Sequence, residues 1–180
     1  MTLQEKYKKE AVPKMKEIFG YKNNLAAPRI KKVVVNCGIG RIVAAGGGEA
    51  ILENIRTDLA AICGQTPQAV NAKKSISAFK ARQGMKSGLR ATLRGRRMYD
   101  FLSRLVNIAL PRTKDFRGID KKSIDQSGNL TIGVKEHIIF PEVSAEEVKN
   151  IFGFELTICT DSSREEAAEL LRLLGFPIKD

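Results

Sequence analysis

Hydrophobic and polar positions along the chain follow two different periods. Apolar residues recur three or four positions apart, the spacing of a buried helix face, at 7–19, 51–62, 98–108 and 170–174. They alternate with polar residues at the period of a half-buried strand at 30–37, 89–93, 130–134 and 154–158. Between these groups, the stretch 65–71 is interrupted by Pro67 and could hold only a short edge strand. The mixture predicts an α+β fold with a mostly antiparallel sheet and helices packed on one of its faces.

Capping and turn residues mark the ends of the expected helices. A Ser or Thr followed three residues later by Glu forms a capping box, which predicts helix starts at Thr2, Ser144 and Ser163. Pro13 predicts a kink or break in the first helix, and Pro111 predicts the end of the helix over 98–108. Glycines follow the apolar stretches and predict helix ends: Gly20, Gly64 and Gly175.

Composition narrows the class of protein. The chain has 180 residues, of which 43% are hydrophobic, enough for a packed core. No apolar run approaches the roughly 20 residues that span a bilayer, and the N-terminus lacks the apolar core of a signal peptide. Cys37, Cys63 and Cys159 are odd in number and far apart, so we expect buried thiols rather than disulfides or zinc ligands. These features favour a cytoplasmic protein with no metal and no cofactor.

Charge is distributed unevenly. The formal net charge is +11, and residues 1–100 hold 20 basic and 7 acidic side chains. Between Asp58 and Asp100 the sequence has no acidic residue but nine cations: Lys73, Lys74, Lys80, Arg82, Lys86, Arg90, Arg94, Arg96 and Arg97. Such a run is tolerated when an outside polyanion supplies the missing charge. The sequence therefore favours a nucleic-acid partner.

Two expected strands have faces of opposite character. Alternation over 86–94 puts apolar Leu89, Ala91 and Leu93 on one face. The other face of that strand carries polar and cationic side chains: Lys86, Arg90, Thr92 and Arg94. The same period places Lys32, Val34 and Asn36 together on another strand. A sheet built this way packs one face on helices and leaves the other basic for RNA. Residues 72–86 contain few large apolar side chains and predict a long, basic, protruding loop.

Several stretches resemble the universal five family of bacterial large-subunit ribosomal proteins, which binds 5S ribosomal RNA (rRNA). They hold their order and spacing over nearly the whole chain: Pro28-Arg29, 36–40, 59–65, 72–75, 79–84, 92–95, Pro111-Arg112, 115–118 and 138–142. The sequence departs from the family pattern at Gly46–Gly48, where it is longer, and at Gln68 and Val70.

The resemblance implies a structural, non-enzymatic constituent of the large subunit, folded as a single RNA-binding domain over 1–180. It implies partners in 5S rRNA, the large rRNA, peptidyl-site transfer RNA (tRNA), neighbouring large-subunit proteins and a small-subunit protein across a subunit bridge, and no membrane. By position, 5S rRNA contacts fall on Lys32, Asn36, Gln65 and Thr92, to which we add the flanking cations Arg90 and Arg94. The implied tRNA loop supplies a second set: Lys73, Lys74, Ser75, Phe79, Lys80, Arg82, Gln83 and Lys86.

Other interpretations remain open at this point. An RNA chaperone outside the ribosome would explain the charge equally well. An RNA-modifying enzyme would need a catalytic constellation, and the single His137 suggests a surface or structural role instead. A peripheral membrane protein would need a large apolar face beside the cations, which the sequence lacks. Phe79 would either stack on a base or pack the loop onto the body of the protein.

Overall fold

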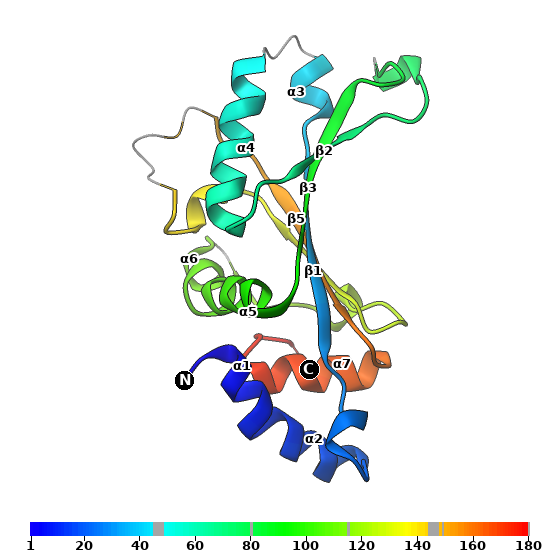
Figure 1. Cartoon of the computed structure of the whole chain (residues 1–180), viewed down its shortest axis with the longest axis vertical. Coiled ribbons are helices and arrows are strands. Elements are labelled where there is room, and N and C mark those ends of the chain that lie inside the picture. The colour runs from blue at the N-terminus through cyan, green and yellow to red at the C-terminus, as the bar shows by residue number, and fades with distance from the viewer. Residues whose placement is uncertain (45–48, 80, 115, 144–147, 149, 180) are drawn as a thin grey trace. The chain divides into compact units, whose positions relative to one another are not determined.

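The predicted α+β fold is confirmed by a five-stranded antiparallel sheet with helices (Figure 1). The computed structural model describes residues 1–44, 49–79, 81–114, 116–143, 148 and 150–179. The strand order is β2-β3-β1-β5-β4. The strands are β1 (Ile30–Gly38), β2 (Gln68–Asn71), β3 (Lys86–Leu93), β4 (Leu130–Val134) and β5 (Phe154–Thr160). The four-residue β2 is the short edge strand expected over 65–71.

The chain divides into two compact units. The first unit comprises Met1–Val33, Arg94–Ile132 and Thr157–Asp180, and the second comprises Val34–Leu93 and Gly133–Leu156. Strands β1, β4 and β5 each contribute residues to both units.

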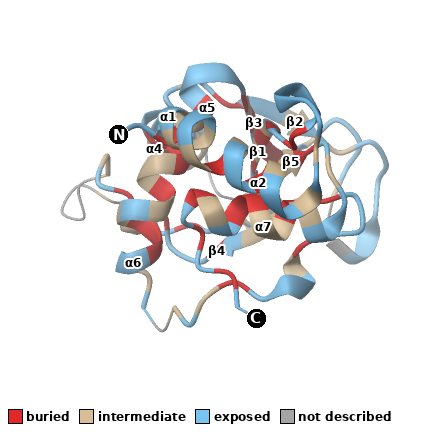
Figure 2. Cartoon of the chain, turned by 90° about the horizontal axis from the view of Figure 1, so that it is seen from below, coloured by how far each residue is buried: buried red, intermediate tan, exposed pale blue. Residues whose placement is uncertain are grey.

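The helices of the first unit bury the apolar stripes that the sequence predicts. They are α1 (Leu3–Lys6), α2 (Val12–Phe19), α5 (Gly95–Arg104), α6 (Leu110–Arg112) and α7 (Arg164–Leu174). Helix α1 packs on α5, and α2 packs on α7. Met15, Phe101 and Leu171 are fully buried, whereas Ile18, expected in the core, is 55% exposed. Figure 2 shows buried and exposed residues alternating along α7, as an amphipathic helix requires.

Two prolines in this unit lie just beyond π-helical turns. The turn Tyr7–Ala11 precedes Pro13, and the turn Leu105–Ala109 precedes Pro111. In a π-helical turn each backbone N–H donates to the carbonyl oxygen five residues earlier, rather than four. The carbonyl that would clash with the proline ring in a regular α-helix is therefore displaced. The helix does not break at Pro13: helical backbone continues from the π-helical turn through Pro13 to Phe19. The predicted end before Pro111 is wrong, because helical backbone continues to Arg112.

The expected helix caps are present wherever the structure describes them. Thr2 and Ser163 each form a capping box with the Glu three residues on, and Gly20 and Gly175 end their helices with positive φ. The capping box predicted at Ser144 lies outside the described residues, as does the segment Gly46–Gly48.

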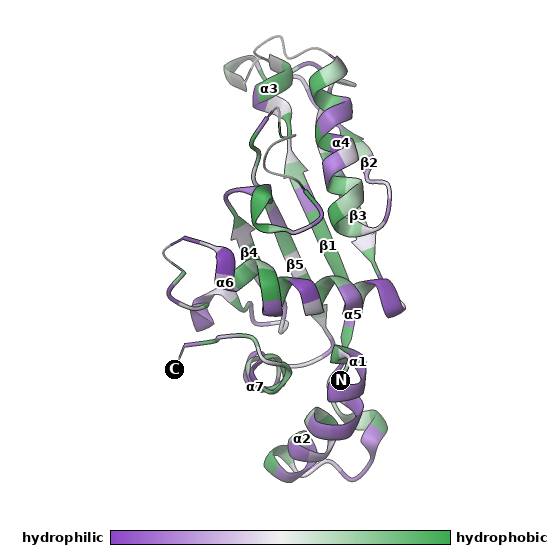
Figure 3. Cartoon of the chain, turned by 90° about the vertical axis from the view of Figure 1, so that its left-hand side faces the viewer, coloured by the Kyte–Doolittle hydropathy of each residue, from purple (hydrophilic) through white to green (hydrophobic). Residues whose placement is uncertain are grey.

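The second unit places helices against β3. Helices α3 (Gly40–Ala44) and α4 (Glu49–Cys63) both contact that strand, and Figure 3 shows α4 passing in front of it. Ile55, Leu59 and Ile62 form the buried side of α4, as their spacing predicts. This packing covers one face of β3 and leaves its other face for solvent.

His137 was expected to have a surface or a structural role, and the structure shows the structural one. Its ring is fully buried and stacks on Phe152, with ring centroids 3.9 Å apart. The Phe152 N–H donates to Nδ1 at 3.3 Å, and Nε2 lies 3.6 Å from Asp58 Oδ2 on α4. The histidine therefore connects two loop segments to a helix inside the second unit.

The described residues show no site for a metal and no helix able to span a membrane. No group of three or more metal-ligating side chains occurs among them, and every helix found there is too short or too polar to cross a bilayer. None of the three cysteines forms a disulfide, and Cys37 and Cys63 are buried as expected. Cys159 is only half-buried because it lies on the polar side of β5.

Candidate RNA-binding surface

Strand β3 has the two faces that its sequence predicts. Leu89, Ala91 and Leu93 are buried, whereas Arg90 is exposed and Thr92 half-buried. The next residue of the polar series, Arg94, is exposed and follows the strand directly in the chain. Because alternate residues of a strand point the same way, the side chains of Arg90 and Thr92 form a polar row on β3. A register shift opposite Val70 and Asn71 interrupts the alternation before Lys86, which pairs with Glu49 of α4 instead.

Strand β2 widens this polar face in the second unit. It pairs antiparallel with β3, with Gln68 opposite Arg90 and Val70 opposite Gly88. Residues opposite one another in such a pair share a face of the sheet. Gln68 and Val70, where the sequence departs from the family pattern, therefore lie directly beside the row of β3.

On the other side of β3, Asn36 of β1 lies close to Gly88. A Cβ atom added at Gly88 would lie 3.2 Å from the Cys37 carbonyl oxygen and 3.9 Å from Asn36 Oδ1. Asn36 is exposed, and Lys32, which precedes it by four positions in the same alternating series, is half-buried. The glycine thus lets the two backbones approach closely beneath an accessible amide side chain.

Gln65 and Thr92, separated by 27 positions, are brought together. The Gln65 side-chain amide donates to the Thr92 carbonyl oxygen across 3.5 Å, a weak hydrogen bond at that length. Gln65 follows Gly64, whose φ of +64° ends α4 and turns the chain toward the sheet. The end of α4 therefore delivers a neutral polar side chain to the edge of the β3 row.

The loop between β2 and β3 is held by its own hydrogen bonds. Ile76 and Ala81 exchange two backbone bonds of 2.9 and 3.1 Å, and the Gln83 N–H donates to Ser75 Oγ at 2.9 Å. The exposed side chains of Lys73, Lys74 and Arg82 project from this frame. Lys80 and the side chain of Phe79 lie outside the described residues.

Comparison with known proteins decides the family. The profile described as "Ribosomal protein L5" matches residues 23–82, and a second profile, for the C-terminus of the same ribosomal family, matches residues 86–178. The chain belongs to the ribosomal L5 family. Bacterial members of this family are structural, non-enzymatic components of the ribosome in the cytoplasm.

Curated relatives within the ribosomal L5 family match nearly the full chain. The "Large ribosomal subunit protein uL5" of Kosmotoga olearia is 50% identical over 181 residues, covering 99% of this chain and 97% of the relative. The proteins of the same name from Halothermothrix orenii and Desulforapulum autotrophicum are each 47% identical. They cover 98% and 99% of this chain, and 97% and 99% of their own lengths.

In this L5-family chain, two cations of the acid-free interval have partners that sequence counting missed. Lys86 Nζ lies 3.2 Å from Glu49 Oε1, at the start of α4, and Arg96 Nε lies 3.7 Å from Asp100 Oδ2. Both pairs are exposed and therefore weak. Lys86 is the first residue of β3, as the alternation over 86–94 predicts, so it borders the loop rather than lying within it. Glu49 lies 37 positions before Lys86, so no local pattern could have revealed the pair.

Proposed function

We propose that this protein is a constituent of the large ribosomal subunit that binds 5S rRNA through the polar sheet face. The contacts are those expected from the sequence: Lys32, Asn36, Gln65, Arg90, Thr92 and Arg94. The two-faced strand β3 is the observation that carries the proposal. Its apolar face is buried, while its exposed Arg90, and Arg94 directly after the strand, have no ion-pair partner in the described part of the chain.

The chemistry of this face suits RNA recognition by shape. Arginines neutralise phosphates and release counterions, which makes binding strongly salt-dependent. Asn36, Gln65 and Thr92 add uncharged donors and acceptors, which suit ribose hydroxyls and base edges. Strands and a helix end fix all three residues. Recognition on such a rigid frame requires little ordering of the protein when the RNA binds.

The protruding loop would contact a second RNA. Lys73, Lys74 and Arg82 extend from a frame whose hydrogen bonds involve Ser75 and Gln83. Such cations would touch the backbone of peptidyl-site tRNA without reading its sequence. In the same assembly the domain over 1–180 would attach 5S rRNA to the large rRNA, adjoin neighbouring large-subunit proteins and meet a small-subunit protein across a subunit bridge.

A filter-binding titration with 5S rRNA tests the sheet face. The double variant Asn36→Ala, Thr92→Val should weaken binding by about 1–3 kcal/mol for each hydrogen bond lost, or roughly tenfold or more. The matched control is Asn54→Ala, Thr57→Val, which makes the same two changes on α4. Unchanged affinity of the first variant, or equal loss in the control, would refute the assignment.

Sucrose-gradient sedimentation separates this proposal from an RNA chaperone acting outside the ribosome. A subunit constituent must co-migrate with large subunits after a salt wash that removes loosely bound proteins. Recovery only at the top of the gradient would favour the chaperone.

A further inference from the structure

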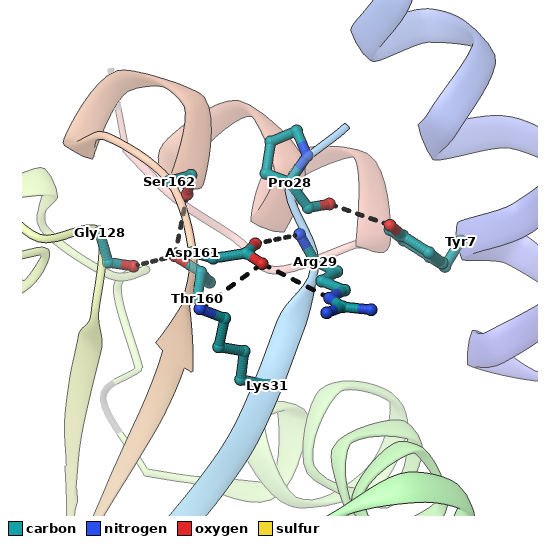
Figure 4. Close-up of polar contacts among 8 residues, drawn as sticks. All are labelled: Tyr7, Pro28, Arg29, Lys31, Gly128, Thr160, Asp161 and Ser162. Atoms are coloured by element: carbon teal, nitrogen blue, oxygen red, sulfur yellow. Dashed lines mark hydrogen bonds and ion pairs between the residues drawn. The ribbon is translucent and has the colours of Figure 1, made fainter. Parts of the chain in front are cut away.

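The stretch Pro28-Arg29, one of those that resemble the family, has no part in the sheet face described above. Figure 4 shows that it meets the turn after β5 in the first unit. Asp161 accepts from the Arg29 backbone N–H at 2.9 Å, and its other oxygen lies 3.4 Å from Arg29 Nε and 3.7 Å from Lys31 Nζ. The start of β1 and the end of β5 are therefore joined through one carboxylate.

The two cations of this cluster face solvent, whereas the carboxylate is more enclosed. The side chains of Arg29 and Lys31 are 67% and 54% exposed, and that of Asp161 is 28% exposed. Because Arg29 meets the carboxylate through Nε, its terminal nitrogens remain available to an external acceptor. Two cations around one carboxylate also leave a net positive charge at the site.

The frame around the cluster is fixed by short polar contacts (Figure 4). The Thr160 hydroxyl donates to the Gly128 carbonyl oxygen at 2.8 Å and lies 2.9 Å from Ser162 Oγ. The Tyr7 hydroxyl donates to the Pro28 carbonyl oxygen at 3.1 Å. These contacts hold the turn that carries Asp161 and the segment that carries Arg29, so the backbone beneath the cations is fixed before any partner arrives.

Two tyrosine rings stand beside Arg29. The rings of Tyr7 and Tyr99 lie 6.4 Å apart and are inclined by 34°. Burial raises the pKa of both phenols, and the nearby positive charge of Arg29 opposes that rise in each case. The positive charge of Arg29 is thus close enough to both phenols to act on them electrostatically.

Strand geometry separates this cluster from the 5S face. Arg29 and Lys31 continue the series of alternate positions to which buried Val33 and Val35 belong, whereas Lys32 has the opposite parity. The cluster therefore lies on the side of β1 that faces away from Lys32.

We propose that Arg29 and Lys31, oriented by Asp161, form a second RNA contact that binds phosphates of the large rRNA. This inference rests on the proposed function, because it takes rRNA as the polyanion. The guanidinium fork matches the geometry of phosphate oxygens, and preorientation lowers the entropy that the arginine loses on binding. The protein would then lie between two RNA segments, with 5S rRNA on one side of β1 and the large rRNA on the other.

The test compares three variants for binding to deproteinised large rRNA and, separately, to 5S rRNA. Arg29→Met, Lys31→Met removes both charges but keeps the aliphatic stems. Asp161→Asn removes the carboxylate and keeps both cations. Lys121→Met, Lys122→Met is the matched control, because it removes two exposed charges from the same unit. Thermal melting of each protein measures how much the cluster contributes to folding.

The variants have opposite expected effects on large-rRNA binding. Losing two phosphate contacts should reduce the slope of log K against log salt by about 1.4–1.8. Raising the salt from 50 to 200 mM weakens binding of both proteins. The fold loss of affinity should then be about seven to twelve times smaller for the Arg29→Met, Lys31→Met protein than for the unmodified protein. Asp161→Asn should bind large rRNA at least as tightly as the unmodified protein, although it melts at a lower temperature.

Three results would overturn the inference. The first is a salt slope for the Arg29→Met, Lys31→Met protein equal to that of the control. This result would mean that the cluster stabilises the fold or contacts a protein rather than RNA. The second is weaker large-rRNA binding by Asp161→Asn despite intact folding at the assay temperature. The third is equal loss of 5S binding, which would place the cluster on the first surface. If the proposed 5S face is wrong, the double variant Asn36→Ala, Thr92→Val would instead bind 5S rRNA with unchanged affinity.

Discussion

Acidification should destabilise this protein through His137, its only histidine. The ring is fully buried against Phe152, whose N–H donates to Nδ1. The proton of the neutral ring therefore lies on Nε2, which points toward Asp58 Oδ2 at 3.6 Å. Protonation would place a second hydrogen at Nδ1, opposite the Phe152 N–H. Burial lowers the pKa of His137, and the Asp58 carboxylate only partly opposes that effect.

The sign and the upper limit of the effect follow from linkage. In the unfolded chain a histidine takes up a proton as the pH falls through about 6.5, whereas the folded protein resists protonation to a lower pH. The stability present above pH 6.5 is therefore lost on acidification, at no more than about 1.36 kcal/mol per pH unit. Between pH 7.5 and 5.5 His137 accounts for at most about 1.4 kcal/mol of lost unfolding free energy.

Urea unfolding at pH 7.5, 6.5 and 5.5 measures this loss, with His137→Asn as the control. The asparagine Oδ1 can still accept from the Phe152 N–H, but the side chain does not titrate. The variant should be less stable at every pH because the ring contact is lost, and the pH dependence due to His137 should disappear. Identical pH dependence in both proteins would refute the argument. Greater stability at pH 5.5 would show that Asp58 stabilises an imidazolium instead.

Two further predictions concern the loop and a turn. Replacing Lys73, Lys80 and Arg82 with Ala should weaken tRNA binding in a filter assay and leave 5S binding intact, and equal loss of both would contradict the separate roles of loop and sheet. Gly128→Ala should lower the melting temperature, because its φ is +74° and the added Cβ would collide with the turn after β5. Gly84 has a similar φ of +83°, but an added Cβ would meet no neighbouring atom, so Gly84→Ala should cost only the backbone strain of about 1–2 kcal/mol. An equal loss of stability in the two variants would contradict the expected collision at Gly128.

The sequence predicted those elements whose signals are local. Alternation placed Leu89 and Arg90 on opposite faces of β3, and the capping box at Ser163 located the start of α7. Each of these signals depends on residues only a few positions apart. The capping box reflects hydrogen bonds within the helix itself, and the alternation reflects which side of the strand packs on the core.

The features that the sequence could not predict depend on distant partners. Lys86 appeared unpaired until the fold brought Glu49 within 3.2 Å, and Arg29 meets Asp161 across 132 positions. The exposure of Ile18 has the same origin, because its helical spacing is correct but the described elements leave its side of α2 uncovered. Pattern shows which face of an element is apolar, and tertiary structure decides how much of that face is covered.

Tertiary pairing also locates the positive charge that needs an outside anion. Glu49 and Asp100 partly offset Lys86 and Arg96, whereas Arg90 has no ion-pair partner in the described part of the chain. Arg90 therefore keeps an uncompensated charge on the exposed face of β3, and its repulsion with the neighbouring cation Arg94 opposes folding of the free protein. Under the proposed function, an RNA bound to this face would remove the repulsion and would bind only the folded state. Its binding energy would then stabilise the sheet and couple RNA binding to folding.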